Sequence, residues 1–133
     1  MKLAIVGSRS ITDWEWFHEE LNGHLVNTPS FFKGAVPYKL SVLSGGAKGI
    51  DTMAKKWAEI HEVDFYLFEP YHLVDKVDFS PKYFFARNRQ IARNCDEMVV
   101  FWDGESKGTL HILEYAKKIG KKVTVIRYPK AQQ

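Results

Sequence analysis

Two patterns of apolar residues alternate along the chain. Short continuous runs, typical of buried strands, occupy residues 2–6, 40–43, 64–68, 98–102 and 122–126. Between them lie longer stretches in which apolar side chains recur every three or four positions, as on one face of an amphipathic helix. Strands that alternate with such helices are typical of a parallel sheet covered by helices. We therefore expect an α/β fold with a mainly parallel five-stranded sheet.

The same periodicity predicts four helices, at residues 14–25, 50–58, 81–94 and 109–119. Residues that favour helix ends support these limits: Thr12 or Asp13 can cap the first helix, Ser80 the third, and Gly120 ends the last. Residues 27–39 include two prolines and a glycine, so we expect an irregular connector there.

Length and composition fit a single domain that spans residues 1–133. Of the 133 residues, 45% are hydrophobic and 26% charged, which is enough apolar material for one core. The longest apolar run, residues 98–102, is far shorter than the roughly 20 residues of a membrane span or the 7 or more of a signal-peptide core. A cytoplasmic protein without membrane contact is expected. Cys95 is the single cysteine, which excludes an intrachain disulfide and a cysteine-based zinc site.

Positive charge gathers in the second half of the chain, although the net charge is only +3. Residues 82–94 hold four basic side chains and no acid, and residues 117–130 hold six. Such stripes are more often a solvated face than a nucleic-acid surface, so a nucleic-acid partner is possible but less favoured. The five histidines show no HxxxH or HxH spacing, and no metal site is expected.

Three turns between a strand and the next helix carry the residues best suited to binding a ligand. These turns, at residues 7–10, 44–49 and 103–109, are rich in Gly, Ser, Lys and Arg. The carboxyl ends of parallel strands lie at one edge of a sheet, so the turns should converge on one crevice. Backbone N–H groups at the starts of helices bind phosphate, and the expected ligand is therefore an anion.

The turn at residues 44–49, Ser-Gly-Gly-Ala-Lys-Gly, allows two interpretations. Gly45 and Gly46 permit a close approach of a ligand to the backbone, but a glycine turn before a helix is equally explained by packing. The spacing is neither that of a Walker A loop nor that of the dinucleotide motif GxGxxG. Asp51 follows in the first turn of the helix, where its charge suits the helix dipole.

The helix predicted at residues 81–94 contributes two further candidates. Asn88 falls on the apolar stripe of this helix and faces the core or the crevice. Arg87 borders that stripe, where its guanidinium can meet a phosphate or a carboxylate. Arg89 and Arg93 lie four residues apart on another face and are expected to be solvated.

Four strings in this order resemble the SLOG superfamily, named for Smf/DprA and LOG proteins: GSR at residues 7–9, SGGAKGID at 44–51, ARNRQIA at 86–92 and KGT at 107–109. The nearest likeness is to its small stand-alone YspA-like branch, over about residues 2–127. The resemblance implies a Rossmann-like three-layer sandwich that binds a nucleoside monophosphate, ADP-ribose or a signalling nucleotide. With the turns above, it gives these expected ligand-binding residues: Gly7, Ser8, Arg9, Ser44, Gly45, Gly46, Ala47, Lys48, Gly49, Asp51, Arg87, Asn88, Asp103, Gly104, Lys107, Gly108 and Thr109.

The chain departs from the LOG enzymes, which cleave the N-glycosidic bond of nucleoside monophosphates and carry the motif PGGxGTxxE. Ile112 stands where the glutamate of that motif is expected. A glycosidase without this carboxylate loses a main electrostatic stabilisation of its transition state. We therefore favour ligand binding as the function and keep hydrolysis as the second interpretation. If the protein is an enzyme, Arg87, which matches the arginine of the family, and Glu114 are the catalytic candidates.

Two alternatives to a nucleotide-binding protein therefore stay open, a LOG-like nucleotide N-glycosidase and a single-stranded DNA binder. DprA proteins carry motifs that resemble the strings at residues 44–51 and 87–92, and they bind single-stranded DNA. Because SLOG relatives often pair, the resemblance also implies a homo-oligomer. No separate cofactor is expected.

Overall fold

The computed structural model describes residues 1–27, 32–33, 36–37, 39–71, 78 and 80–129. The main sheet is made of β1 (Lys2–Gly7), β4 (Ser41–Ser44), β5 (Asp64–Leu67), β6 (Glu97–Trp102) and β7 (Lys122–Arg127). The strands lie in the order β5-β4-β1-β6-β7, and every pairing in this sheet is parallel. The predicted parallel five-stranded sheet is confirmed.

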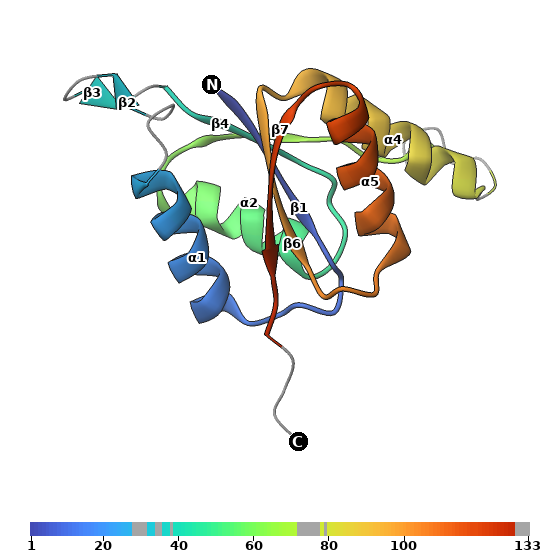
Figure 1. Ribbon diagram of the computed structural model, residues 1–133, viewed down its shortest axis with the longest axis horizontal. Helices are drawn as coiled ribbons and strands as arrows, with labels where there is room; N and C mark the ends of the chain where they lie inside the picture. The colour runs from blue at the N-terminus through green and yellow to red at the C-terminus, as the bar shows by residue number, and fades with distance from the viewer. Residues whose placement is uncertain (28–31, 34–35, 38, 72–77, 79, 130–133) are drawn as a thin grey trace.

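Helices cover both faces of this sheet (Figure 1). On one face lie α1 (Trp14–Val26) and α2 (Ile50–Ile60), and on the other α4 (Pro81–Asn94) and α5 (Lys107–Lys118). Side chains of β1 alternate between the two layers, since Leu3 and Ile5 pack into the core beneath α1 and α2 whereas Ala4 and Val6 pack beneath α4 and α5. The arrangement is the Rossmann-like three-layer sandwich that the resemblance implied.

The ends of the helices follow from their capping residues. Asp13 caps α1 through its side chain, and Ser80 occupies the N-cap position of α4 without a side-chain hydrogen bond to that helix. α5 begins at Lys107, two residues earlier than predicted, because the Ser106 hydroxyl accepts a hydrogen bond from the Thr109 N–H. In the described part of the chain, no helix has the length and apolar character needed to cross a membrane.

The connector predicted between residues 27 and 39 is not irregular throughout. A two-stranded antiparallel sheet pairs β2 (Phe32–Lys33) with β3 (Val36–Pro37). The prediction is wrong at these four residues, because two-residue strands are too short to leave a periodic pattern in a sequence. Residues 28–31, 34–35 and 38 of this segment lie outside the described residues.

The direction in which the chain crosses the sheet reverses at β1. From the central β1 the chain moves outward to β4 and β5, and it then crosses to the other side of β1 to form β6 and β7 (Figure 1). In open parallel sheets a crevice forms at such a reversal, outside the carboxyl ends of the two strands. The fold therefore points to the ends of β1 and β6.

Candidate functional site

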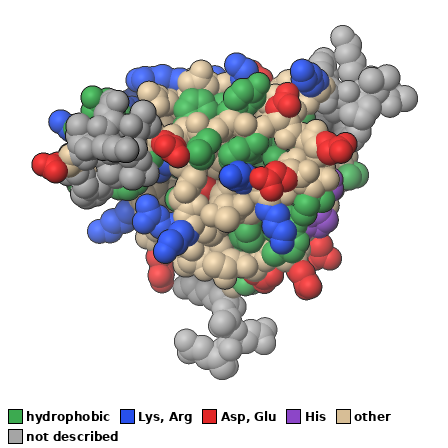
Figure 2. Space-filling view, turned by 180° about the vertical axis from the view of Figure 1, so that it is seen from behind, with side chains coloured by type: hydrophobic (Ala, Val, Ile, Leu, Met, Phe, Trp, Pro, Cys, Tyr) green, Lys and Arg blue, Asp and Glu red, His purple; other side chains and the backbone are tan. Residues whose placement is uncertain are grey.

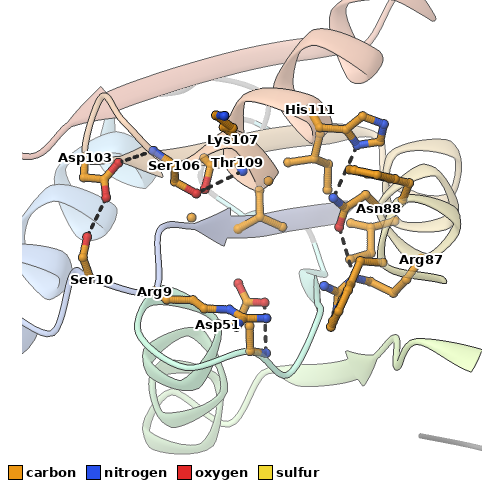
Figure 3. A pocket seen from close by; sticks show the side chains of 18 of the residues that line it. Arg9, Ser10, Asp51, Arg87, Asn88, Asp103, Ser106, Lys107, Thr109 and His111 are labelled. Carbon is orange, nitrogen blue, oxygen red and sulfur yellow. Dashed lines mark hydrogen bonds between the residues drawn. The ribbon is translucent and has the colours of Figure 1, made fainter. Parts of the chain in front are cut away.

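A cavity of about 690 Å³ lies at this reversal point. Its walls come from the turn after β1, the start of α2, the inner face of α4 and the start of α5 (Figure 3). Its lining consists of Val6, Gly7, Arg9, Ser10, Ala47, Asp51, Pro81, Phe84, Phe85, Arg87, Asn88, Ile91, Asp103, Ser106, Lys107, Gly108, Thr109, His111 and Ile112. A volume of this order is typical of small-molecule sites.

Asp103 joins the turns that follow β1 and β6. Its Oδ2 accepts a hydrogen bond from Ser10 Oγ at 2.6 Å, and its Oδ1 accepts the N–H groups of Glu105 and Ser106, each at 2.8 Å. The Asp103 N–H donates in turn to the buried Ser8 Oγ at 3.0 Å. Partial burial alone would raise the pKa of Asp103, but these hydrogen bonds outweigh it and lower the pKa to about 2. Asp103 is therefore a fixed anion that holds the two turns together.

The start of α5 points into the cavity with part of its backbone unsatisfied. Ser106 Oγ accepts the N–H of Thr109 at 3.3 Å and its hydroxyl at 3.0 Å. The N–H groups of Lys107 and Gly108 have no acceptor among the residues that the structure describes. Both residues line the cavity, and the exposed Lys107 adds its ammonium group. The start of α5 is thus suited to an anion.

The glycines of the turn at residues 44–49 serve close packing. Gly49 has φ +76°, and a Cβ at this position would lie 2.6 Å from the carbonyl oxygens of Ser8 and Arg9. A Cβ on Gly45 would lie 2.5 Å from the Arg87 Nη1. Both glycines let this turn approach neighbouring groups that a larger residue would displace.

The carboxyl group of Asp51, which belongs to the protein itself, contacts the backbone of this turn. Its Oδ2 accepts the Ala47 N–H at 3.2 Å, where a ligand phosphate was expected. Its Oδ1 is buried and has no hydrogen-bond partner among the described residues. Burial raises the pKa of Asp51, against the opposing charge of Arg87 and the hydrogen bond from Ala47. Because the unpartnered Oδ1 is buried, Asp51 holds the turn in place and has little surface that a ligand could reach.

Arg87 is buried at 7% exposure and held by the protein on two of its three nitrogens. Its Nη1 donates to the carbonyl oxygen of Gly45 at 2.6 Å, and its Nε donates to Asn88 Oδ1 at 3.1 Å. The Nη2 has no acceptor among the described residues. Burial lowers the pKa of Arg87, and the neighbouring Asp51 opposes this shift. The guanidinium is therefore fixed in place with one nitrogen left for a ligand.

Aromatic side chains of α4 form the apolar wall of the cavity. The Arg9 and Arg87 guanidinium carbons lie 5.6 and 5.7 Å from the centre of the Phe84 ring, within cation–π range. The Phe85 and His111 rings lie 4.4 Å apart between centroids. Burial lowers the pKa of His111, and the nearby Arg89 lowers it further, so the imidazole is neutral at pH 7.

Basic side chains are also concentrated on one side of the outer surface. In the view from behind, several Lys and Arg side chains gather next to the grey atoms at the left, on the side of the molecule where α4 begins in Figure 1 (Figure 2). The helix itself has no acidic residue in its first turn. The surface beside the cavity is thus favourable to an anion that approaches it.

Comparison with known proteins assigns the chain to a family. The family described as "YspA, cpYpsA-related SLOG family" matches residues 1–72, which is more than half of the chain. The chain belongs to this SLOG family. The chain is also similar to the Gene 61 protein of Mycobacterium phage D29, with 34% identity over 125 residues and 90% of each chain covered.

A solved structure shows the same fold as this SLOG domain. It is that of DNA processing protein A from Helicobacter pylori, from a study of the single-stranded DNA binding mode of that protein. The TM-score is 0.67 at 21% sequence identity, with 97% of this chain covered. The chain covers 66% of the length of that structure. At this sequence identity, the similarity shows a common fold and nothing further.

The residues expected from the sequence fall into two groups in the SLOG domain. Those that line the cavity are Gly7, Arg9, Ala47, Asp51, Arg87, Asn88, Asp103, Lys107, Gly108 and Thr109. Those outside its lining are Ser8, Ser44, Gly45, Gly46, Lys48, Gly49 and Gly104. Ser8 and Ser44 are fully buried and hydrogen-bonded within the sheet layer, whereas Gly46 and Lys48 are exposed. The turn after β4 thus supports the cavity more than it lines it.

The two positions that decide the glycosidase interpretation lie apart. Ile112 is 3% exposed and lines the cavity, so an apolar side chain takes the place of the expected carboxylate. Glu114 is exposed and lines a neighbouring hollow on the outer side of α5. The cavity of this SLOG domain therefore offers Asp51 and Asp103 as its carboxylates.

Several residues of the cavity were not expected from the sequence. Those with a polar or aromatic side chain are Ser10, Phe84, Phe85, Ser106 and His111. A usable signal existed for three of them: the cavity-facing stripe of α4 that contains Asn88 also contains Phe84, and Ser10 and Ser106 lie in turns already singled out. Nothing in the sequence indicated that His111 meets Phe85, because the contact joins two helices.

Proposed function

We propose that the cavity binds a phosphate-bearing nucleotide or a nucleotide-derived ligand. The observation that carries this proposal is that the start of α5 lies in the same cavity as an aromatic wall and carries Lys107, which forms no ion pair with the residues that the structure describes. Lys107 and the N–H groups of α5 suit a phosphate, and the rings of Phe84 and Phe85 suit a base or sugar. A cavity with a few polar groups and a largely apolar wall is the usual form of such sites.

The polar groups along α4 and α2 give the ligand an orientation. With its phosphate at the start of α5, the nucleoside lies along α4, where Asn88 and the Arg87 Nη2 can bond to oxygens of the sugar or base. Asp51 lines the same wall from α2, where its carboxyl fixes the turn by accepting the Ala47 N–H.

Calorimetric titration with AMP, GMP, CMP and UMP tests this function. Because Lys107 is exposed, Lys107→Gln should leave the fold intact and weaken binding about 5- to 10-fold through loss of one charge-assisted contact. Arg87→Gln should weaken it about 10- to 100-fold. Lys117→Gln, an exposed change on the same helix outside the cavity, is the control and should bind like the wild type. The proposal would be contradicted if none of the four nucleotides binds, or if Lys107→Gln and Lys117→Gln have equal effects on binding.

Single-stranded DNA is the second candidate ligand. It is favoured by the fold shared with DNA processing protein A, whose study names single-stranded DNA binding. The salt dependence of oligonucleotide binding separates a cavity from an extended track, because each neutralised phosphate adds about 0.7 to the slope of log K against log salt. A slope of about 2 or more would favour a DNA track over a nucleotide cavity.

A further inference from the structure

A second hollow adjoins the cavity, on the exposed side of α4 and α5. Its volume is about 720 Å³, and it is lined by Arg89, Lys107, Leu110, His111, Glu114, Tyr115, Lys118 and Ile119. Lys107 and His111 line both this hollow and the cavity. The two spaces therefore share a border.

Positive charge predominates in the second hollow. Arg89, Lys107 and Lys118 face one acidic side chain, that of Glu114. None of the three cations forms an ion pair with another residue that the structure describes. Lys107 and Lys118 are exposed and Arg89 is half-buried, so all three can reach an anion from solvent.

Aromatic surface continues from the cavity into this hollow. Phe85 is 40% exposed and packs against His111 at the border. Beyond the border, the Arg93 guanidinium lies 5.5 Å from the centre of the Tyr115 ring, which is itself part of the lining. The neutral His111 adds a hydrogen-bonding ring without placing a further charge beside Lys107. Flat rings between cations are what a second base or sugar needs.

The proposed function leaves these groups unused. A mononucleotide with its phosphate at Lys107 ends at the border, and Arg89, Lys118 and Tyr115 lie beyond it. The position of Lys107, in both linings, suits a phosphate that links two nucleosides better than one that ends the ligand. The two spaces have similar volumes, each within the range that small ligands occupy.

We propose that the ligand is a dinucleotide unit with a 5′-phosphate, either free or as part of a strand. Its 3′ nucleoside occupies the cavity and its linking phosphate lies at Lys107 and the start of α5. Its 5′ nucleoside lies over the border of Phe85 and His111, and its 5′-phosphate lies between Arg89 and Lys118. This inference rests on the proposed function, because it extends the ligand from the phosphate position assigned there.

The test compares three ligands that share one base: the mononucleotide, the dinucleotide without its 5′-phosphate and the 5′-phosphorylated dinucleotide. Affinities are measured by calorimetry for each of the four bases. For the wild type, the 5′-phosphate should raise dinucleotide affinity about 10-fold or more. In the double variant Arg89→Gln/Lys118→Gln this gain should fall below about 3-fold, while mononucleotide affinity changes less than about 2-fold. Lys117→Gln, outside both hollows, should retain the full gain.

Three outcomes overturn the inference. They are equal wild-type affinity with and without the 5′-phosphate, an unchanged gain in the double variant, and an equal loss for mononucleotide and dinucleotide in that variant. If mononucleotides bind and dinucleotides bind no more tightly, the inference fails and the proposed function stands. If no mononucleotide or dinucleotide binds, both fail.

An eight-nucleotide single strand then separates the two sources of the dinucleotide unit. Affinity above that of the phosphorylated dinucleotide, with a steeper salt dependence, identifies a strand as the ligand. Affinity no higher than that of the dinucleotide identifies a free dinucleotide. Either result agrees with the inference, because the contacts of Arg89 and Lys118 are the same in both.

Discussion

Asp103 connects two turns that belong to strands far apart in the sequence. Its hydrogen bonds to Ser10, Glu105 and Ser106 all favour the ionised carboxylate, which is why its pKa lies near 2. The shift from 3.8 to about 2 would correspond to about 2.5 kcal/mol of folding stability for a shielded group. Asp103 is half-buried and partly screened by water, so we expect a smaller contribution of about 1 kcal/mol.

Replacement of this single carboxylate tests that contribution. Asp103→Asn should lower the free energy of unfolding by about 1 kcal/mol at pH 7. Because the folded-state pKa is depressed, the stabilisation is fully present above the unfolded pKa of 3.8 and is lost as pH falls toward 2. Urea unfolding of both proteins between pH 7 and pH 3 should therefore show a difference that is constant down to about pH 4 and then shrinks. A difference that is as large at pH 3 as at pH 7 would contradict the assignment.

At the level of elements, the turn between β4 and α2 depends on the absence of a side chain. Gly49→Ala should lower the free energy of unfolding by more than about 2 kcal/mol, because its positive φ disfavours alanine and the added Cβ meets the carbonyl oxygens of Ser8 and Arg9. Gly23, inside α1, has no atom within 4 Å of an added Cβ. Gly23→Ala should raise the same free energy by roughly 0.5–1 kcal/mol. Urea unfolding measures both, and a Gly49→Ala protein as stable as the wild type would exclude this packing role.

The elements that could be predicted from the sequence are those long enough to show a clear hydrophobic pattern. β1 and β6 contain continuous apolar runs at residues 3–6 and 98–102, and α2 carries an apolar stripe from Ile50 to Ala58, so each is visible without a structure. The pairing of Phe32–Lys33 with Val36–Pro37 was missed, because backbone hydrogen bonds between two-residue strands leave no such pattern. The early start of α5 depends on one hydroxyl, that of Ser106, and on its geometry.

The candidate site was predictable as far as it lies in turns next to strands. Strand ends converge in any parallel sheet, so the turns containing Arg9, Asp103 and Lys107 could be brought together from topology alone. The sequence could not show which residues of the turn at 44–49 bind a ligand and which serve packing, since glycine permits both ligand approach and close packing. The contact between Gly45 and Arg87 indicates that Gly45 serves packing. This contact joins residues that are 42 positions apart, so no local pattern reveals it.

At the scale of the whole molecule, a shared fold hosts different chemistry in related proteins, and the cavity decides which. Ile112 gives this cavity an apolar wall, and Glu114 faces the second hollow. We therefore expect no release of free base from AMP, GMP, CMP or UMP, because no carboxylate lies where the glycosidase motif requires one. Chromatography of the reaction mixture checks this. Multiple turnovers that disappear in Arg87→Ala would overturn this expectation and would require a catalytic role for Glu114.

The ionised carboxylate that joins the turns after β1 and β6 limits the charge capacity of the cavity. Asp103 offsets one of the three cations in the lining, which are Arg9, Arg87 and Lys107, whereas burial raises the pKa of Asp51 and opposes its negative charge. A ligand that brings one or two negative charges leaves the cavity near neutrality, whereas a triphosphate would bring a large excess that low-polarity walls cannot screen. Discrimination against nucleoside triphosphates, the most abundant competitors in a cell, would thus come from an acid inside the protein and need no residue that touches the second or third phosphate.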